Sequence, residues 1–253
     1  MTKLTIKEDL SGEQSSSDCT VVILCGGKGT RLRPLTNEQP KGMVSVGGKP
    51  MLEHILHQYQ RYGYHRFVIC IGYRGEVIQN YFAHLPAGVT IQFSDAGEEA
   101  SMLQRLWHAR PFLSQQIIVS YCDTFIDMNP NNLLEYHNRM AVDITLVTAP
   151  IRNPFGVVDA DEHGLVDRFE EKPLYDCFIG CYLLQRSTLD NLPPDLLEMS
   201  DGSGLVALFS RLAEERRLAA YSHLGIQINF NTVSEHQEAE GALSRYHTCL
   251  ESS

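Results

Sequence analysis

The chain has 253 residues and a mass of 28.5 kDa, enough for one large domain with a substantial core. Hydrophobic residues make up 43% and charged residues 21%, a composition that excludes a disordered or a fibrous protein. Acidic residues outnumber basic ones by 31 to 21, so the formal net charge of -10 has the wrong sign for binding a nucleic-acid backbone. We therefore expect no nucleic-acid polymer among the partners.

The sequence contains no apolar run of the roughly 18 to 20 residues that a membrane-spanning helix requires, and its first residues lack a secretory apolar core. We expect a cytoplasmic protein that does not bind a membrane. Its seven cysteines are scattered without zinc-finger spacing, and several lie in apolar strand-like runs. This pattern predicts buried thiols rather than metal ligands or disulfides.

The sequence predicts three parts along the chain. Residues 1–18 are polar, with a serine run and no periodicity, and are predicted to be a flexible leader. Residues 19–246 are predicted to form a single domain, followed by a tail over residues 247–253.

Within the domain, short β-branched runs alternate with amphipathic stretches, which indicates a mostly parallel sheet with helices on both faces. The predicted strands are Thr20–Leu24, Phe67–Ile71, Val89–Phe93, Ile117–Tyr121, Asp143–Ala149, Phe178–Leu184 and Ala219–Ser222. The predicted helices are Met51–Tyr62, Gly75–Phe82, Ala100–Ala109, Leu133–Arg139, Leu205–Glu215 and Val233–Leu243. Between residues 150 and 172 the pattern predicts short antiparallel strands around a His163–Gly164 turn. We therefore expect an α/β fold with a mixed sheet and a small antiparallel portion.

A glycine-rich loop follows the first predicted strand. Gly26, Gly27 and Gly29 allow the backbone to approach a ligand closely and to present N–H groups to phosphate oxygens. Positive charge is concentrated in and after this loop, at Lys28, Arg31, Arg33 and Lys41. The spacing fits neither the Rossmann GxGxxG nor the P-loop pattern, which disfavours hydride transfer and Walker-type ATP hydrolysis. The loop is typical of a triphosphate-binding site.

This stretch resembles the opening of sugar-1-phosphate nucleotidyltransferases, whose pattern is roughly GGxGTRLxPLT, then PKxM and a GGKPM-like run. The matching segments are Gly26–Thr36, Pro40–Met43 and Gly47–Met51. The resemblance implies a Rossmann-like nucleotidyltransferase fold whose antiparallel portion binds sugar. It also implies nucleotide binding by Leu24, Gly26, Gly27, Gly29, Thr30 and Arg31.

A carboxylate, Asp123, follows the buried strand Ile117–Tyr121, at the edge where open α/β sheets bind ligands. It matches the aspartate that binds metal in the family, and Mg²⁺ needs only one or two such carboxylates. Near the chain end the family carries a second aspartate before a threonine, where this chain has Asn231. An asparagine oxygen can still bind Mg²⁺ but removes a negative charge, so we expect weaker metal binding by Asp123 and Asn231.

The segment Glu170–Pro173 matches the EKP element of the family, in which the lysine contacts the sugar phosphate and the glutamate contacts sugar hydroxyls. The resemblance therefore implies a sugar-phosphate site containing Gly156, Glu171, Lys172 and Gly180. A solvated run of charges is the alternative explanation of these residues. A second departure from the family is Met102–Arg105, where cytidylyltransferase relatives have a TGGR element.

The resemblance implies attack of a sugar-phosphate oxygen on the α-phosphorus of an NTP, with Arg33, Lys41 and Asp123 as catalytic residues. The run Gly72–Ile78 looks most like the glucose-1-phosphate cytidylyltransferase branch and favours CTP. Two alternatives remain open: a regulatory relative that binds nucleotide sugars without turnover, and a transferase for a heptose phosphate or phosphocholine. A glycosyltransferase is disfavoured because Asp123 and Asp127 after the buried strand are too widely spaced for the DxD motif of that class. A homo-oligomer is the usual expectation for a soluble enzyme.

Overall fold

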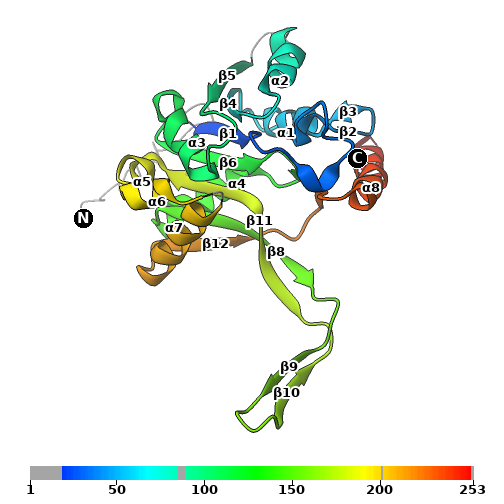
Figure 1. Ribbon diagram of the computed structural model, residues 1–253, viewed down its shortest axis with the longest axis vertical. Helices are drawn as coiled ribbons and strands as arrows, with labels where there is room; N and C mark the ends of the chain where they lie inside the picture. The colour runs from blue at the N-terminus through cyan, green and yellow to red at the C-terminus, as the bar shows by residue number, and fades with distance from the viewer. Residues whose placement is uncertain (1–18, 85–88, 201, 252–253) are drawn as a thin grey trace, which may run out of the picture.

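The computed structural model describes residues 19–84, 89–200 and 202–251. Its core is a seven-stranded sheet with the strand order β12-β8-β11-β6-β1-β4-β5 (Figure 1). The strands are β1 (Cys19–Leu24), β4 (Arg66–Ile71), β5 (Thr90–Asp95), β6 (Gln116–Tyr121), β8 (Ile144–Arg152), β11 (Leu174–Gln185) and β12 (Leu218–Ser222). All neighbouring pairs are parallel except those of β11, which runs antiparallel to both β6 and β8. The predicted mixed, mostly parallel α/β fold is therefore confirmed.

Alternation along the strands builds a hydrophobic core on each face of the sheet. In β1, Val21 and Ile23 belong to one cluster, whereas Val22 and Leu24 belong to the other. The first cluster includes side chains of α1 (Met51–Gln60), α4 (Pro130–Met140) and α8 (Val233–Glu251). The second includes those of α3 (Met102–Ala109), α5 (Arg186–Asp190), α6 (Pro194–Glu198) and α7 (Ser203–Glu214). Burial on both faces explains why the parallel strands read as continuous apolar runs.

Every long element that periodicity predicts is present, with ends that shift by a few residues. The helix predicted from Gly75 is α2 (Gly75–Tyr81), and α8 continues well past its predicted end at Leu243. Five of the seven residues in the predicted tail are therefore helical, since α8 ends at Glu251. The short strands β2 (Ser45–Val46), β3 (Lys49–Pro50), β7 (Thr124–Ile126) and β13 (Gln227–Asn229) were not predicted, nor were α5 and α6. The predicted leader lies outside the described residues.

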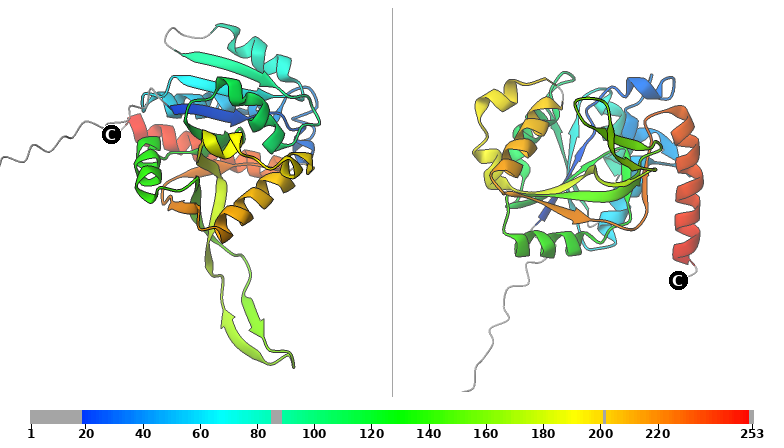
Figure 2. Two further views of the ribbon diagram at one scale, coloured as in Figure 1. Left: turned by 90° about the vertical axis from the view of Figure 1, so that its left-hand side faces the viewer. Right: turned by 90° about the horizontal axis from the view of Figure 1, so that it is seen from below.

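The predicted antiparallel portion is a long arm that projects from the body of the molecule (Figures 1 and 2). Its outer part is the hairpin β9 (Val157–Ala160) and β10 (Val166–Glu170). Its inner part is the pairing of β8 with β11, which runs from Leu174 opposite Arg152 to Phe178 opposite Thr148. We define the arm as residues 150–178. Because β8 and β11 are themselves strands of the central sheet, the inner part of the arm is an extension of that sheet.

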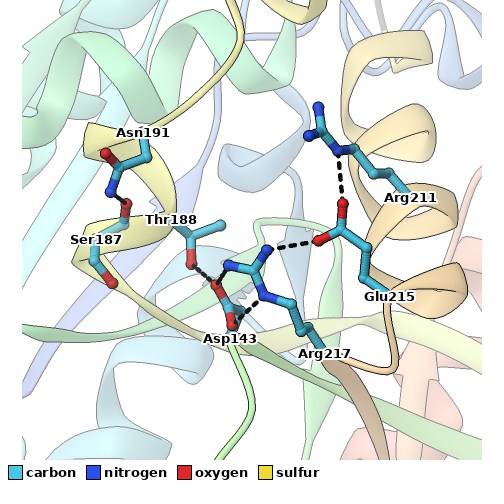
Figure 3. Close-up of polar contacts among 7 residues, drawn as sticks. All are labelled: Asp143, Ser187, Thr188, Asn191, Arg211, Glu215 and Arg217. Carbon is cyan, nitrogen blue, oxygen red and sulfur yellow. Dashed lines mark hydrogen bonds and ion pairs between the residues drawn. The ribbon is translucent and has the colours of Figure 1, made fainter.

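A charged network fixes the edge of the sheet where β8, β12 and α7 meet (Figure 3). Arg217 donates two hydrogen bonds to the Asp143 carboxylate, at 2.9 Å from Nε and 2.6 Å from Nη2. Its third nitrogen bonds Glu215 at 2.6 Å, and Glu215 also accepts from Arg211 at 2.9 Å. Bidentate pairing of this kind adds geometric specificity, so the network orients the chain entering β12.

The described helices include none that is long and apolar enough to cross a membrane.

Candidate active site

A cavity of about 650 Å³ opens at the carboxyl ends of β1, β5 and β6. Open α/β sheets bind ligands at this edge because the loops leaving adjacent parallel strands meet there. One wall is the predicted glycine loop, with Leu24, Gly26, Gly27 and Gly29. The opposite wall comes from the segment leading into α3 and from the end of α6. The volume lies within the range of small-molecule sites.

The glycine loop has the geometry that its sequence predicts. Gly29 adopts φ +58°, a left-handed conformation that other residues rarely adopt. The Thr36 hydroxyl donates to the Gly29 carbonyl at 2.8 Å and so fixes the exit of the loop. Thr30 and Arg31 follow in a 3₁₀ turn, η2 (Thr30–Leu32), and line a smaller adjoining cavity of about 190 Å³. All six predicted nucleotide-binding residues therefore border one of two neighbouring cavities.

Arg105 supports the glycine loop from below, a role that the sequence analysis missed. Its side chain is buried and donates to three backbone carbonyls: Ile71 at 2.6 Å, Gly26 at 3.2 Å and Glu98 at 2.9 Å. These carbonyls belong to the last residue of β4 and to the segments that follow β1 and β5. Burial lowers the pKa of the guanidinium from its ordinary value. The sequence does contain one indication of this role: Arg105 is a charged residue next to Leu106, on the apolar side of the predicted helix.

The contact with Arg105 explains why position 26 is glycine, and it yields a matched pair of variants. A Cβ at Gly26 would lie 2.0 Å from the Arg105 Cζ, whereas a Cβ at Gly27 would meet nothing within 4 Å. We expect Gly26→Ala to expel the guanidinium from its carbonyls and to lower the unfolding free energy by about 2–3 kcal/mol. Gly27→Ala should cost less than about 1 kcal/mol. Chemical denaturation of both variants measures the difference, and equal losses would contradict this packing.

Three distant segments bring Lys41, Asp123 and Asn231 together at the junction of the two cavities. The Lys41 ammonium donates to Asp123 Oδ2 at 2.6 Å and to Asn231 Oδ1 at 2.9 Å. Arg31 donates to the same Asn231 oxygen at 3.1 Å. The Thr124 hydroxyl bonds the second Asp123 oxygen at 2.9 Å and thereby orients the carboxylate. The structure thus brings three predicted site residues into direct contact, with the oxygens of Asp123 and Asn231 bonded to the Lys41 ammonium.

The chemistry of this oxygen pair fits Mg²⁺. A carboxylate oxygen and an amide oxygen converge on a single cation, the Lys41 ammonium, and both border the cavities. Mg²⁺ is typically held by one or two protein oxygens, with water and substrate phosphates completing its octahedron. The described residues contain no group of three or more His, Cys, Asp or Glu side chains suited to holding a metal. The donor set is therefore suited to a metal that arrives with a nucleotide.

The other loop cations are more exposed. Lys28 forms ion pairs with Glu99 at 2.5 Å and with Glu98 at 4.0 Å, across the mouth of the larger cavity. The hydrogen bond to Glu99 and the negative charge of that carboxylate raise the pKa of Lys28. Arg33 is exposed at the end of η2 and is not among the residues that border either cavity. Lys28 therefore borders the larger cavity, whereas Arg33 can meet a ligand only at the rim.

The predicted sugar-phosphate residues divide into two groups. Gly180 lies at the site: a Cβ there would be 3.0 Å from the Tyr121 ring and 3.5 Å from the Thr124 hydroxyl. Gly156, Glu171 and Lys172 lie on the arm. The structure brings these three together, since a Cβ on Gly156 would lie 3.2 Å from a Glu171 oxygen, and Lys172 pairs with Glu171 at 3.8 Å. None of the three is among the residues that border the cavity at Asp123.

The family-level comparison matches this site. The model of the nucleotidyl transferase family matches residues 20–246, which include the glycine loop, Asp123 and Asn231. The chain belongs to the nucleotidyl transferase family.

Individual relatives of this family cover most of the chain. The "Probable glucose-1-phosphate cytidylyltransferase" of Bacillus subtilis is 30% identical over an alignment of 235 residues, which covers 83% of this chain and 91% of the relative. The mannose-1-phosphate guanyltransferase of Debaryomyces hansenii is 33% identical over 215 residues, covering 79% of this chain and 58% of the relative. The crystal structure of HddC from Yersinia pseudotuberculosis superposes with a TM-score of 0.69. It is 20% identical and covers 88% of this chain and 99% of its own, so it supports the shared fold.

Proposed function

We propose that the protein transfers a nucleotidyl group from an NTP to a sugar 1-phosphate, giving a nucleotide sugar and pyrophosphate. The observation that carries this proposal is the convergence of Lys41, Asp123 and Asn231 beside a glycine loop. A phosphate oxygen of the sugar attacks the α-phosphorus of the NTP. The new O–P bond forms as the bond to the β-phosphate oxygen breaks, and pyrophosphate leaves with its charge.

Positioning and charge neutralisation supply the catalysis, because this chemistry needs no covalent protein intermediate. The N–H groups of the glycine loop and Arg31 bind the triphosphate. Lys41 lies at the junction of the cavities and neutralises charge near the α-phosphate. Arg33, exposed at the rim, binds the outer phosphates as the nucleotide enters.

Mg²⁺ is the cofactor that we propose, held by Asp123 with assistance from Asn231. Bound there, the metal would neutralise triphosphate oxygens and align the leaving group. The Lys41 ammonium, which now bonds both oxygens, then turns to the phosphate. Asn231 is neutral, so the site carries one negative charge less than the two-aspartate pattern.

Among nucleotides we favour CTP, and among acceptors glucose 1-phosphate, on the basis of the cytidylyltransferase of Bacillus subtilis and the Gly72–Ile78 run. GTP and UTP or dTTP are competing donors, since the relative from Debaryomyces hansenii is a guanyltransferase and another relative, from Synechocystis sp., is a UTP--glucose-1-phosphate uridylyltransferase. A heptose phosphate or phosphocholine remains an alternative acceptor.

Pyrophosphate release with Mg²⁺, measured over a grid of NTPs and sugar 1-phosphates, tests the proposal. We expect release only when both substrates are present, with one preferred pair. Binding of nucleotide without release for any pair would support the second candidate, a regulatory nucleotide-sugar-binding relative. The observation favouring that candidate is Asn231 in place of a second carboxylate.

A further inference from the structure

Tyr73, in the turn that follows β4, contacts both ends of the glycine loop. Its backbone N–H donates to the Gly26 carbonyl at 3.2 Å, where the loop begins. Its side-chain hydroxyl lies 2.7 Å from the Asn37 carbonyl and 3.2 Å from the Thr36 carbonyl, which form the exit of the loop. A hydroxyl has one hydrogen to donate, so the shorter contact is the principal bond. One residue therefore holds the start and the exit of the loop together.

The exit that Tyr73 holds is packed directly against Gly29 and Lys41. Thr36 is fully buried, and its hydroxyl donates to the Gly29 carbonyl at 2.8 Å. A Cβ on Gly29 would lie 3.1 Å from the Thr36 Cγ2 and 3.4 Å from the Lys41 Cβ. Closely packed groups transmit a displacement to one another. A shift of Thr36 would therefore be passed to the backbone that carries the Lys41 ammonium.

The two ends of the loop are supported differently. The start has a second support, because Arg105 also donates to the Gly26 carbonyl at 3.2 Å. At the exit, the bonds from Thr36 to Gly29 and from the Asn37 amide to the Pro34 carbonyl lie within the segment itself. The Tyr73 hydroxyl, by contrast, ties the exit to the turn after β4. Its loss should therefore release the exit more than the start.

We infer that Tyr73 is a positioning residue for the nucleotidyl transfer, an inference that rests on the proposed function. Its hydroxyl fixes the exit of the glycine loop and thereby presents the Lys41 ammonium to the α-phosphate. Tyr73 is half-buried and is not among the residues that border the two cavities of the site. It therefore acts through Thr36 and Asn37 rather than by touching a substrate.

Tyr73→Phe tests this role because it removes one oxygen and keeps the backbone N–H bonded to Gly26. The loop amides that bind the triphosphate stay supported by that bond and by Arg105, so we expect the KM for the NTP to change by less than about twofold. The turnover number should fall by about tenfold, because a small misplacement of a catalytic group is costly. The stoichiometry of nucleotide binding measures the competent fraction, so that kcat is expressed per competent site.

Tyr136→Phe is the matched control. Its hydroxyl also donates to a backbone carbonyl, that of Ala220 at 2.8 Å, but the bond joins α4 to β12. Neither residue is among those that border the two cavities of the site. The control loses the same group from the same type of bond, so we expect wild-type kcat and KM. Melting curves of both variants verify that they fold.

Hydrogen exchange of the unliganded proteins tests the contact without relying on activity. We expect faster exchange over residues 33–44 in Tyr73→Phe and wild-type exchange there in Tyr136→Phe. An unchanged kcat, unchanged exchange over residues 33–44, or equal effects in the two variants would overturn the role of Tyr73. Wild-type protein that releases no pyrophosphate with any substrate pair would instead refute the proposed function, and hydrogen exchange would then decide whether Tyr73 holds the exit of the loop.

Discussion

Asp123→Asn is expected to lower turnover by about 100-fold or more, while the protein stays folded. The substitution keeps the shape of the side chain and removes the charge that pairs with Lys41 at 2.6 Å. It also removes the single carboxylate that we propose for Mg²⁺. Lys41 keeps its bond to Asn231, so the loss of unfolding free energy should be only about 1 kcal/mol. Steady-state pyrophosphate release and thermal melting measure both effects.

The matched variant Asn231→Asp changes the charge in the opposite direction. Its oxygen already accepts from Lys41 and Arg31, and a carboxylate can accept both bonds. The added charge should lower the Mg²⁺ concentration needed for half-maximal rate by several-fold. Wild-type turnover in Asp123→Asn, or an unchanged Mg²⁺ requirement in Asn231→Asp, would contradict the metal site that we propose.

Arg105→Met is expected to lower the unfolding free energy by about 3 kcal/mol, because two buried carbonyls and one partly buried carbonyl lose their shared donor. The apolar stem stays packed in α3, so the change isolates the guanidinium. One of the carbonyls belongs to Gly26 of the glycine loop, so its release should also loosen that loop. We expect the KM for the NTP to rise at least about tenfold, since a loop that must be ordered on binding reduces affinity.

Arg105→Lys is the control for charge. Its compact ammonium keeps the positive charge but lacks the planar fork that spans three carbonyls, so we expect intermediate stability. Denaturant unfolding and NTP-dependent kinetics separate the variants. If methionine and lysine behave alike and near wild type, the loop does not depend on Arg105.

The regular elements could be predicted from local sequence because burial imposes a clear periodicity. β1 and β6 are continuous apolar runs, and helix α3 begins at a capping box formed by Ser101 and Gln104. The short strands β7 and β13 escaped prediction because each has three residues and pairs only with the other, about a hundred positions away in sequence. Such pairing leaves no local pattern.

The site was predicted in part. Resemblance to the family indicated Lys41, Asp123 and Asn231, and the structure brings them together. A second aspartate close by, Asp127, accepts from the Ile226 amide and lies 2.9 Å from a His223 nitrogen, where it fixes a turn. No local signal could distinguish these roles, because Asp127 directly follows β7, a three-residue strand that the sequence did not predict.

The direction of the arm could not be predicted from its sequence. The turn at His163–Gly164 and the alternation around it indicated a hairpin, and β9 and β10 form one. Whether Glu171 and Lys172 then face their own site depends on the register of β8 with β11, which joins segments far apart in the chain. That register directs the arm outward.

Transfer of oxygen-18 from a labelled acceptor tests the central proposal most directly. The protein is incubated with Mg²⁺, the preferred NTP and a sugar 1-phosphate whose phosphate oxygens carry the label. Mass spectrometry then measures the oxygen-18 content of each product. Attack of the sugar phosphate on the α-phosphorus predicts all of the label in the nucleotide sugar and none in pyrophosphate. Label in pyrophosphate or inorganic phosphate, or no nucleotide sugar at all from a folded protein that binds NTP, would contradict it.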